Sequence, residues 1–385
     1  MWHIHKLSDV ATITGGGTPS TKVSEYWDGE IDWYTPNEIG ERIYARGSKK
    51  KITNLGYKKS STKLLPINTI LFTSRAGIGN TAILAKEGCT NQGFQSIIPN
   101  SEKIDSYFIY TISNHIKKYA LKHAAGSTFL EISGKELGKM KLFLPSLKEQ
   151  QKIGVFFSKL DRQIELEEEK LELLEQQKRG YMQKIFSQEL RFKDDNGNSY
   201  PDWSIKKIED ISKVNKGFTP NTKNDEYWDE LNENWLSIAG MTQKYLYKGN
   251  KGITEKGASK HVKVDKDTLI MSFKLTLGKL AIVKEPIYTN EAICHFVWKE
   301  SNVNTEYMYY YLNSINISTF GAQAVKGVTL NNDSINSIIV KLPVIQEQNK
   351  IAYFFNELDK LIRKQYAKIE VLKQRKKGLL QKMFV

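Results

Sequence analysis

The sequence contains little cysteine and no apolar stretch long enough to cross a membrane. Cys89 and Cys294 are the only two cysteines among 385 residues, and they lack the CxxC spacing of a metal or redox site. We expect both to be reduced thiols that pack as small apolar side chains. No apolar run approaches the roughly 18 residues of a membrane span, and the first residues do not resemble a signal peptide. These absences predict a cytoplasmic globular protein.

Several catalytic motifs are also missing. The chain has nine prolines and no Pro-Pro pair, which excludes the Asn/Asp-Pro-Pro-aromatic motif of amino-methyltransferases. No GxGxxG follows a predicted strand, and no GxxxxGK[ST] phosphate-binding loop is present. The six histidines show no metal-ligand spacing with the cysteines. We therefore expect no catalytic residue, no metal and no cofactor bound by this chain.

Positive charge, in contrast, is abundant. The formal net charge is +14, and residues 1–148 alone hold 20 basic and 12 acidic residues, a net charge of +8. Residues 191–342 carry +2, residues 149–190 carry −2, and residues 343–385 carry +6. Such an excess suits a polyanionic partner, and phosphate contacts would make binding depend on salt.

An internal repeat spans the chain. Tyr26-Trp27-Asp28 matches Tyr227-Trp228-Asp229 at an offset of 201 residues, and Trp2 matches Trp203 at the same offset. Thr69-Ile70-Leu71 aligns with Thr268-Leu269-Ile270 at an offset of 199, which also aligns Arg75 with Lys274. From Leu144-Pro145 against Leu342-Pro343 onward, the offset is 198. A register of this length indicates two copies of one structural unit.

Each copy begins with a domain of about 145 residues and ends with a long helix. Segments 69–74, 95–99, 268–273 and 294–298 read as buried strands, and 105–122 and 304–316 carry apolar residues at helical spacing. We predict an α+β fold with two tandem domains. The predicted boundaries are 1–145 for the first domain, 146–190 for its helix, 191–342 for the linker and second domain, and 343–385 for the second helix.

The two helices carry matching heptad ladders. The predicted seam consists of Ile153, Phe157, Leu160, Ile164, Leu171 and Leu174 in the first copy, and of Ile351, Phe355, Leu358, Ile362, Ile369 and Leu372 in the second. Two copies with one heptad phase favour a coiled coil between the two helices, although each helix could instead pack only on its own domain. Glu167 and Lys178 interrupt the first ladder, and Gln365 and Lys376 interrupt the second at the matching positions. Gly180 and Gly378 sit inside the helices, either to admit another helix closely or because the helix ends fray.

Three loop regions in each copy offer the groups that bind DNA. They are 14–22, 74–80 and 125–133 in the first copy, and 216–223, 273–279 and 326–334 in the second. Cations suit phosphates, and amides, hydroxyls and guanidinium groups suit base edges. The candidate DNA-binding residues are Thr14, Gly16, Thr18, Ser20, Lys22, Ser74, Arg75, Asn80, Ser127, Thr128, Lys216, Thr219, Asn221, Lys274, Lys279, Lys326, Thr329 and Asn331. Structural turns are the alternative interpretation of these loops, and core packing is the interpretation we favour for Trp33 and Trp235.

Motifs spread over the whole chain resemble Type I restriction-modification specificity subunits. The pattern LPxLxEQxxI before a heptad helix occurs as LPSLKEQQKI (144–153) and LPVIQEQNKI (342–351), and KxGxxQKxF closes each helix at 178–186 and 376–384. GGTPST, GST and YPDW elements occupy the expected places. The second copy departs from the pattern at Gly217-Phe218-Thr219 and Gly327-Val328-Thr329.

The resemblance implies a non-catalytic, DNA-binding specificity subunit with two target-recognition domains, each of which reads half of a split target. It implies that the two helices pair as an antiparallel coiled coil and fix the gap between the half-sites. Two modification subunits would bind S-adenosylmethionine and methylate adenine N6, and two restriction subunits would use ATP and Mg²⁺ to cleave DNA. Two other readings stay open: a nucleic-acid-binding enzyme with an unrecognised site, and a scaffold that reads no sequence.

Overall fold

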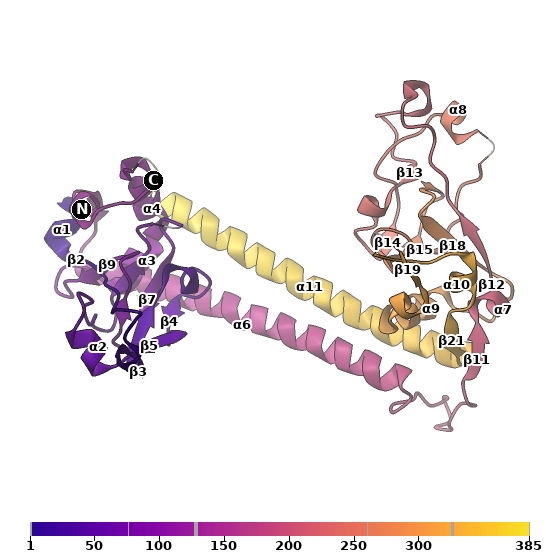
Figure 1. The fold of residues 1–385 in the computed structure, drawn as a ribbon, viewed down its shortest axis with the longest axis horizontal. Helices are drawn as coiled ribbons and strands as arrows, with labels where there is room; N and C mark the ends of the chain where they lie inside the picture. The colour runs from indigo at the N-terminus through magenta and orange to yellow at the C-terminus, as the bar shows by residue number, and fades with distance from the viewer. Residues whose placement is uncertain (1, 76, 127–129, 260, 325–326, 385) are drawn as a thin grey trace. The chain divides into compact units, whose positions relative to one another are not determined.

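The computed structural model describes residues 2–75, 77–126, 130–259, 261–324 and 327–384, with only the backbone for 322–324 and 327–329. The chain divides into two compact units. The first unit comprises Met1–Glu168 and Lys368–Val385, and the second comprises Glu169–Ala367. Each unit therefore holds one recognition domain together with parts of both long helices (Figure 1).

The first unit is a mixed α+β structure. Its strands are β1 (His3–Lys6), β2 (Ala11–Gly15), β3 (Trp27–Tyr34), β4 (Tyr44–Ala45), β5 (Lys50–Ile52), β6 (Ile70–Phe72), β7 (Thr81–Leu84), β8 (Cys89–Thr90), β9 (Gln95–Pro99) and β10 (Lys141–Leu144). Its helices are α1 (Leu7–Val10), α2 (Asn54–Lys58), α3 (Ser106–Thr111), α4 (Ser113–His123), α5 (Gly134–Gly138) and the beginning of α6 (Leu147–Phe186). The main sheet has the order β2-β9-β6-β7-β4, and its β2/β9, β9/β6 and β6/β7 pairs are antiparallel.

The second unit repeats this plan. Its strands are β11 (Ser204–Lys207), β12 (Ser212–Lys216), β13 (Trp235–Leu236), β14 (Tyr245–Leu246), β15 (Leu269–Ser272), β16 (Leu280–Val283), β17 (Tyr288–Thr289), β18 (Ile293–Trp298), β19 (Ala322–Ala324), β20 (Gly327–Thr329) and β21 (Ile339–Leu342). Its helices are α7 (Ile208–Ile211), α8 (Glu255–Ala258), α9 (Thr305–Ser314), α10 (Asn332–Asn336) and most of α11 (Ile345–Met383). The main sheet has the order β12-β18-β15-β16-β14, which matches the first sheet strand for strand.

Apolar side chains cover both faces of each central strand. In β6, Ile70 and Phe72 pack into the core cluster that holds Phe108 of α3, whereas Leu71 packs into the cluster on the other face. In β15, likewise, Leu269 packs into the core cluster on one face and Ile270 into the cluster on the other. Successive side chains of a strand point to opposite faces, so a strand buried on both sides needs an unbroken apolar run. This explains why the runs at 69–74 and 268–273 predict strands correctly.

The long helices pair with each other in each unit, as the heptad ladders predict, and they run antiparallel, as the family resemblance implies. In the first unit Asp161 of α6 lies 2.5 Å from Lys376 of α11, while Glu167, later in α6, lies 2.5 Å from Lys368, which is earlier in α11. In the second unit Lys178 lies 2.6 Å from Asp359, and the Tyr181 ring centroid lies 5.1 Å from that of Phe354. The polar residues that interrupt the ladders, among them Glu167, Lys178 and Lys376, thus form ion pairs across the helix pair.

Burial along the seam is graded. Ile153, Phe157, Leu160 and Ile164 are buried in the first unit, and Ile351 and Phe355 are buried in the second. Ile369 and Leu372 are also buried, whereas Leu171, Leu174, Leu358 and Ile362 are half-buried. The start of each helix therefore packs on its own domain as well as on the other helix. A Cβ added to Gly180 or Gly378 would meet no atom within 4 Å, so neither glycine serves a close helix contact among the described residues of the chain.

Candidate nucleic-acid interface

Two of the predicted loops of the first unit meet at one edge of the main sheet. Strand β2 ends at Gly15, which pairs with Gln95 at the start of β9. Thr73, which follows β6, bridges to Phe94, and the Ser74 amide donates to the Gly93 carbonyl oxygen at 2.8 Å. Because these strands alternate in direction, the end of β2 and the end of β6 lie at the same sheet edge.

The third loop reaches the same edge. The Ile132 amide donates to the carbonyl oxygen of Ser74 at 3.1 Å, and the Ser74 hydroxyl donates to the Glu131 carboxylate at 3.3 Å. Two candidates of this loop, Ser127 and Thr128, lie outside the described residues. The hydrogen bonds of Ser74 join loops 74–80 and 125–133 into one surface.

The second unit brings its loops together in the same way. Lys216 at the end of β12 pairs with Cys294 of β18. The Phe273 amide donates to the Ala292 carbonyl oxygen at 3.0 Å, and the Leu330 amide donates to the Phe273 carbonyl oxygen at 3.2 Å. Lys326 lies outside the described residues, and Thr329 is described by its backbone in β20. We call these two sets of three converging loops the first and second recognition edges.

A glycine and a tryptophan give the first loop of each edge the same geometry in both copies. A Cβ on Gly16 would lie 2.1 Å from the Asn91 carbonyl oxygen, and one on Gly217 would lie 2.1 Å from that of Thr289, so only glycine fits. The Trp33 indole N–H donates to the Gly17 carbonyl oxygen at 2.9 Å. Trp235 makes the same bond, also 2.9 Å long, to Phe218. Both tryptophans are buried, so they hold the loop and do not stack on bases.

The candidates of the first edge differ in access to solvent. Thr18, Ser20 and Lys22 are exposed, and the Thr18 hydroxyl hydrogen-bonds the side chain of Gln92. Arg75 and Asn80 are half-buried. Thr14 and Ser74 are buried, so their side chains contact the rest of the protein and not solvent.

The candidates of the second edge include four exposed residues, Lys216, Asn221, Lys274 and Asn331. The ammonium of Lys216 lies 4.6 Å from the Phe273 ring centroid. Asn221 and Asn331 accept hydrogen bonds from the backbone amides of Lys223 and Ser334, so their oxygens shape turns. Thr219 and Lys279 are half-buried, and Thr219 accepts a bond from Asn290 at 2.9 Å.

Sequence reasoning missed one basic segment beside the first edge. A Cβ on Gly17 would lie 2.4 Å from the Ser61 hydroxyl oxygen, and Thr62 donates to the Thr90 carbonyl oxygen at 3.0 Å. These contacts place residues 58–63 against loop 14–22, and this segment carries the exposed Lys58, Lys59 and Lys63. The paired lysines in the sequence were the available signal.

Buried titratable groups near the edges are uncharged. Burial raises the pKa of Cys89 to about 11 and that of Cys294 to about 12, so both are neutral thiols near pH 7. Burial lowers the pKa of His295 to about 4, and its imidazole Nε2 lies 2.5 Å from the Thr289 hydroxyl oxygen. Among the described residues no group of His, Cys, Asp or Glu has the arrangement of a metal site.

The LPxLxEQ motif joins each long helix to its domain. The Gln150 side chain accepts from the Asp105 amide at 3.0 Å and donates to the carbonyl oxygens of Lys103 and Pro145. Gln348 makes the equivalent three bonds to Asn304, Asn302 and Pro343. These bonds fix the direction in which each helix leaves its domain.

The glutamate of that motif anchors the start of each repeat. Glu149 accepts from the Trp2 indole at 3.2 Å, and Glu347 accepts from the Trp203 indole at 3.0 Å. Arg191 adds a bond to Glu347 at 2.8 Å. The Gln and Glu of the motif are therefore positioning residues.

The phenylalanine that closes each helix packs on the opposite repeat. Phe186, at the end of α6, lies in the second unit with its ring centroid 5.5 Å from Tyr311 and 5.8 Å from Phe355. Phe384, after α11, lies in the first unit with its ring centroid 5.7 Å from Phe108. Each domain core is thus completed by the helix of the other repeat.

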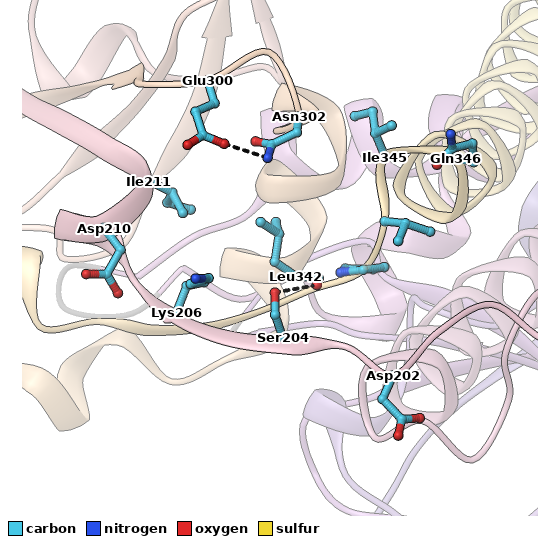
Figure 2. A pocket seen from close by; sticks show the side chains of 12 residues that line it. Asp202, Ser204, Lys206, Asp210, Ile211, Glu300, Asn302, Leu342, Ile345 and Gln346 are labelled. Carbon is cyan, nitrogen blue, oxygen red and sulfur yellow. Dashed lines mark hydrogen bonds between the residues drawn. The ribbon is translucent and has the colours of Figure 1, made fainter.

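A surface hollow of about 480 Å³ lies in the second unit away from the recognition edge. Figure 2 shows it between β11 and the beginning of α11, with Ser204 bonded to the Leu342 carbonyl oxygen at 3.0 Å. Its charged lining residues are Asp202, Asp210, Glu300 and Lys206. This excess of carboxylates disfavours phosphate, so the hollow is not part of the candidate interface.

Among the described residues, no helix is long and apolar enough to span a bilayer.

Comparison with known proteins agrees with this architecture. A family model described as "Type I restriction modification DNA specificity domain" matches residues 1–176 and 200–374. The Type I restriction enzyme MjaIX specificity subunit of Methanocaldococcus jannaschii is 36% identical over 227 residues, 56% of this chain and 52% of that protein. The EcoR124I/EcoR124II specificity subunit of Escherichia coli is 31% identical over 163 residues, 40% of each chain. The matched part thus spans about half the length of these relatives or less.

Solved structures share the fold over the whole chain. The S subunit of a Type I restriction-modification system from M. genitalium has a TM-score of 0.61 at 14% identity, with 100% of this chain and 96% of that chain covered. A chain from a study of complex assembly and conformational transition of the type I R-M system has a TM-score of 0.65 at 14% identity, with 100% and 97% covered. The family model matches far more than half of the chain, and its two matches coincide with the two copies of the repeat. The chain belongs to the Type I restriction-modification specificity subunits, a family of non-catalytic subunits.

Proposed function

We propose that this chain reads a bipartite double-stranded DNA target, one half-site with each recognition edge. The observation that carries the proposal is the convergence of three loops at the same sheet edge in both units. Each edge presents hydroxyls, amides and cations, among them Lys22 and Arg75 in the first and Lys216 and Lys274 in the second. Cations of this kind hold phosphates, and the shorter polar side chains suit base edges.

The two half-sites differ in this proposal because the edges differ. Arg75 aligns with Lys274, and a guanidinium can bind guanine bidentately where an ammonium acts as a point charge. Gly17 aligns with Phe218, whose ring stacks on His261 at a centroid distance of 3.6 Å. The same frame therefore presents different groups to DNA.

The chain acts, in this proposal, with two modification subunits that bind S-adenosylmethionine and methylate adenine N6 in the cytoplasm. Support comes from exposed apolar side chains at equivalent places on the two long helices. Val155 of α6 and its equivalent Tyr353 of α11 are 53% and 68% exposed, and Leu173 and its equivalent Val371 are 58% and 67% exposed. Matched apolar surfaces of this kind suit two copies of one partner.

Two restriction subunits, which would bind ATP and Mg²⁺, complete the proposed complex. ATP-dependent steps belong to them in this proposal, since the sequence of this chain holds no phosphate-binding loop. The isolated chain, given S-adenosylmethionine or ATP with DNA, should neither methylate nor cleave. Product formed by a rigorously clean preparation would favour an enzyme with an unrecognised active site.

Mapping of N6-methyladenine on DNA modified by the complex tests the proposal. We expect methylation at a split target with two unlike half-sites. Replacing residues 1–143 with the first domain of another family member should change one half-site and leave the other intact. Both half-sites changing together would overturn independent reading, and footprints without sequence preference would favour a scaffold.

A further inference from the structure

One leucine of the second recognition edge stands out for its exposure and its backbone. Leu275 lies in loop 273–279, between β15 and β16, and its side chain is 91% exposed. Its φ is +63°, a left-handed conformation that bulky side chains rarely adopt. A strained, solvent-facing aliphatic residue brings no packing to the domain, so its position needs a reason outside the domain.

Hydrogen bonds hold the loop that carries Leu275. The Ser272 hydroxyl donates to the Thr276 carbonyl oxygen and accepts from the Lys279 amide at 3.0 Å. The Gly278 amide donates to the Ser272 carbonyl oxygen at 2.8 Å, and Gly278 itself has a φ of +77°. The buried Ser272 thus closes a tight loop with Leu275 near its tip.

Two cations lie close to Phe273, two residues before this leucine. Lys274 precedes it, and the ammonium groups of Lys274 and Lys216 lie 5.6 Å and 4.6 Å from the ring centroid of Phe273. Both lysines are exposed and belong to the second recognition edge. An edge that carries an exposed aliphatic side chain and two cations is complementary to a surface that alternates phosphate with an apolar group. Double-stranded DNA is such a surface.

The base edges of the major groove present one apolar group, the 5-methyl of thymine. We propose that Leu275 reads a thymine of the second half-site by contact with this methyl group. The inference rests on the proposed function and adds to it a specificity-determining residue and the group that it recognises. The aligned residue of the first copy is Ala76, so we expect no such reading of the first half-site by the aligned position.

Deoxyuridine, which differs from thymidine only by that methyl, provides the test. The complex of the full chain with its modification subunits is bound to duplexes that carry the mapped target, with each thymine of the second half-site replaced in turn. One replacement should weaken binding about fourfold, the factor that corresponds to burial of one methyl-sized group. Leu275→Asn should weaken binding to the unmodified target by at least as much and should no longer respond to that replacement. Asparagine tolerates positive φ, so this variant keeps the loop geometry.

Controls separate the side chain from the fold. Ile67→Asn in the first unit, 56% exposed and at the opposite end of β6 from loop 74–80, should respond to deoxyuridine as the unaltered complex does. Leu275→Asn should also keep its ratio of affinities for intact and mismatched first half-sites, which shows that the complex is assembled.

Each other outcome has a distinct meaning. A second half-site without any A·T pair, an unaltered complex that responds to no deoxyuridine, or a Leu275→Asn variant that keeps the response would overturn the role of Leu275. A Leu275→Asn variant that weakens binding to thymine and deoxyuridine duplexes alike, with loss of DNA bending, would indicate a wedge between base pairs and would also overturn methyl reading. If the unaltered complex does not prefer the target over a scrambled duplex, the proposed function itself fails.

Discussion

The first and second recognition domains share a frame but present unlike surfaces. Residues 1–148 carry a net charge of +8, whereas residues 191–342 carry +2. Lysines of the second domain lie in ion pairs with its own carboxylates, as Lys248 does with Glu233 at 2.5 Å and Lys284 with Asp267 at 2.6 Å. The first domain offers phosphate more uncompensated charge, so its binding should depend more strongly on salt.

The most exposed large apolar side chains of the described residues all lie in the second domain. Leu231, Val262 and Leu275 of the second domain are 96%, 84% and 91% exposed. The residues that align with them in the first domain are Glu30, Lys63 and Ala76. Loops can therefore change from charged to apolar without any change in the sheet, because their shape depends on closely packed residues such as Gly16 and Gly217.

The interiors differ as well. His295 occupies the position of Ser96, and Lys244 occupies that of Ile43. Lys244 lies 2.5 Å from Glu306 and 2.8 Å from the Tyr310 hydroxyl oxygen, and burial lowers its pKa despite these partners. At these two positions the second unit therefore has ionisable side chains in its interior, whereas the first unit has none.

The equivalent ion pairs of the two units should differ most in how much they contribute to stability. Asp161, 5% exposed, accepts from Tyr107 at 2.8 Å and pairs with Lys376, whereas Asp359 is 21% exposed. Lys376→Met should destabilise the first unit by about 3–5 kcal/mol because it leaves a buried carboxylate without its cation. Lys178→Met should cost the second unit less, about 1–2 kcal/mol, because water reaches Asp359. Hydrogen exchange in each unit under native conditions measures both losses.

The double variant Asp161→Leu with Lys376→Met is the control for that prediction. It removes both charges, so most of the lost free energy of unfolding should return. Equal losses from the two single variants would contradict the assigned difference in burial.

Acid should destabilise the second unit more than the first, and this is the next largest expected effect. The pKa of His295 falls from 6.5 to about 4 in the folded protein because burial disfavours the imidazolium. Above pH 6.5 the imidazole is neutral in both the folded and unfolded states. As the pH drops from 6.5 towards 4, only the unfolded state gains the proton, and the second unit should lose up to about 3 kcal/mol.

The aligned Ser96 of the first unit does not titrate, so His295→Ser should remove that part of the pH dependence. Thermal unfolding of the two proteins between pH 7 and pH 4 provides the measurement. An unchanged pH dependence in the variant would show that other groups cause the acid sensitivity.

Charge reversal at aligned cations compares the two edges directly. Arg75→Glu and Lys274→Glu should each weaken binding to the complete target by roughly 1–3 kcal/mol. A base contact would make the loss specific to one half-site, whereas a phosphate contact would weaken binding to all duplexes alike. Binding to specific and scrambled duplexes at fixed salt separates these cases, and no loss on either duplex would remove the residue from the interface.

The smallest effects should be equal in the two copies. Gly180→Ala and Gly378→Ala should each stabilise the protein by about 1 kcal/mol, because alanine favours the helix and the added Cβ meets no neighbour within 4 Å. Gly16→Ala is the contrasting variant and should destabilise, since its Cβ would lie 2.1 Å from the Asn91 carbonyl oxygen. Thermal unfolding checks all three, and a loss for either helix variant would contradict the open environment of these glycines.

The two-copy organisation, the central strands and the pairing of the two long helices could be predicted from the sequence. Their signals are periodic and local: a fixed offset, unbroken apolar runs for buried strands, and a 4,3 ladder for the helices. The sequence also located the loops that form the recognition edges, since Gly-, Thr- and Lys-rich segments follow predicted strands.

The way in which these parts combine is seen only in the three-dimensional structure. Periodicity shows that a face is apolar but not which surface covers it, so it did not reveal that Phe186 and Phe384 complete the core of the opposite repeat. Composition likewise did not separate the buried Thr14 and Ser74 from the exposed Lys22, or bring residues 58–63 beside loop 14–22. Burial depends on contacts between segments far apart in the chain, and the exposed, left-handed Leu275 follows from the closure of one loop by Ser272.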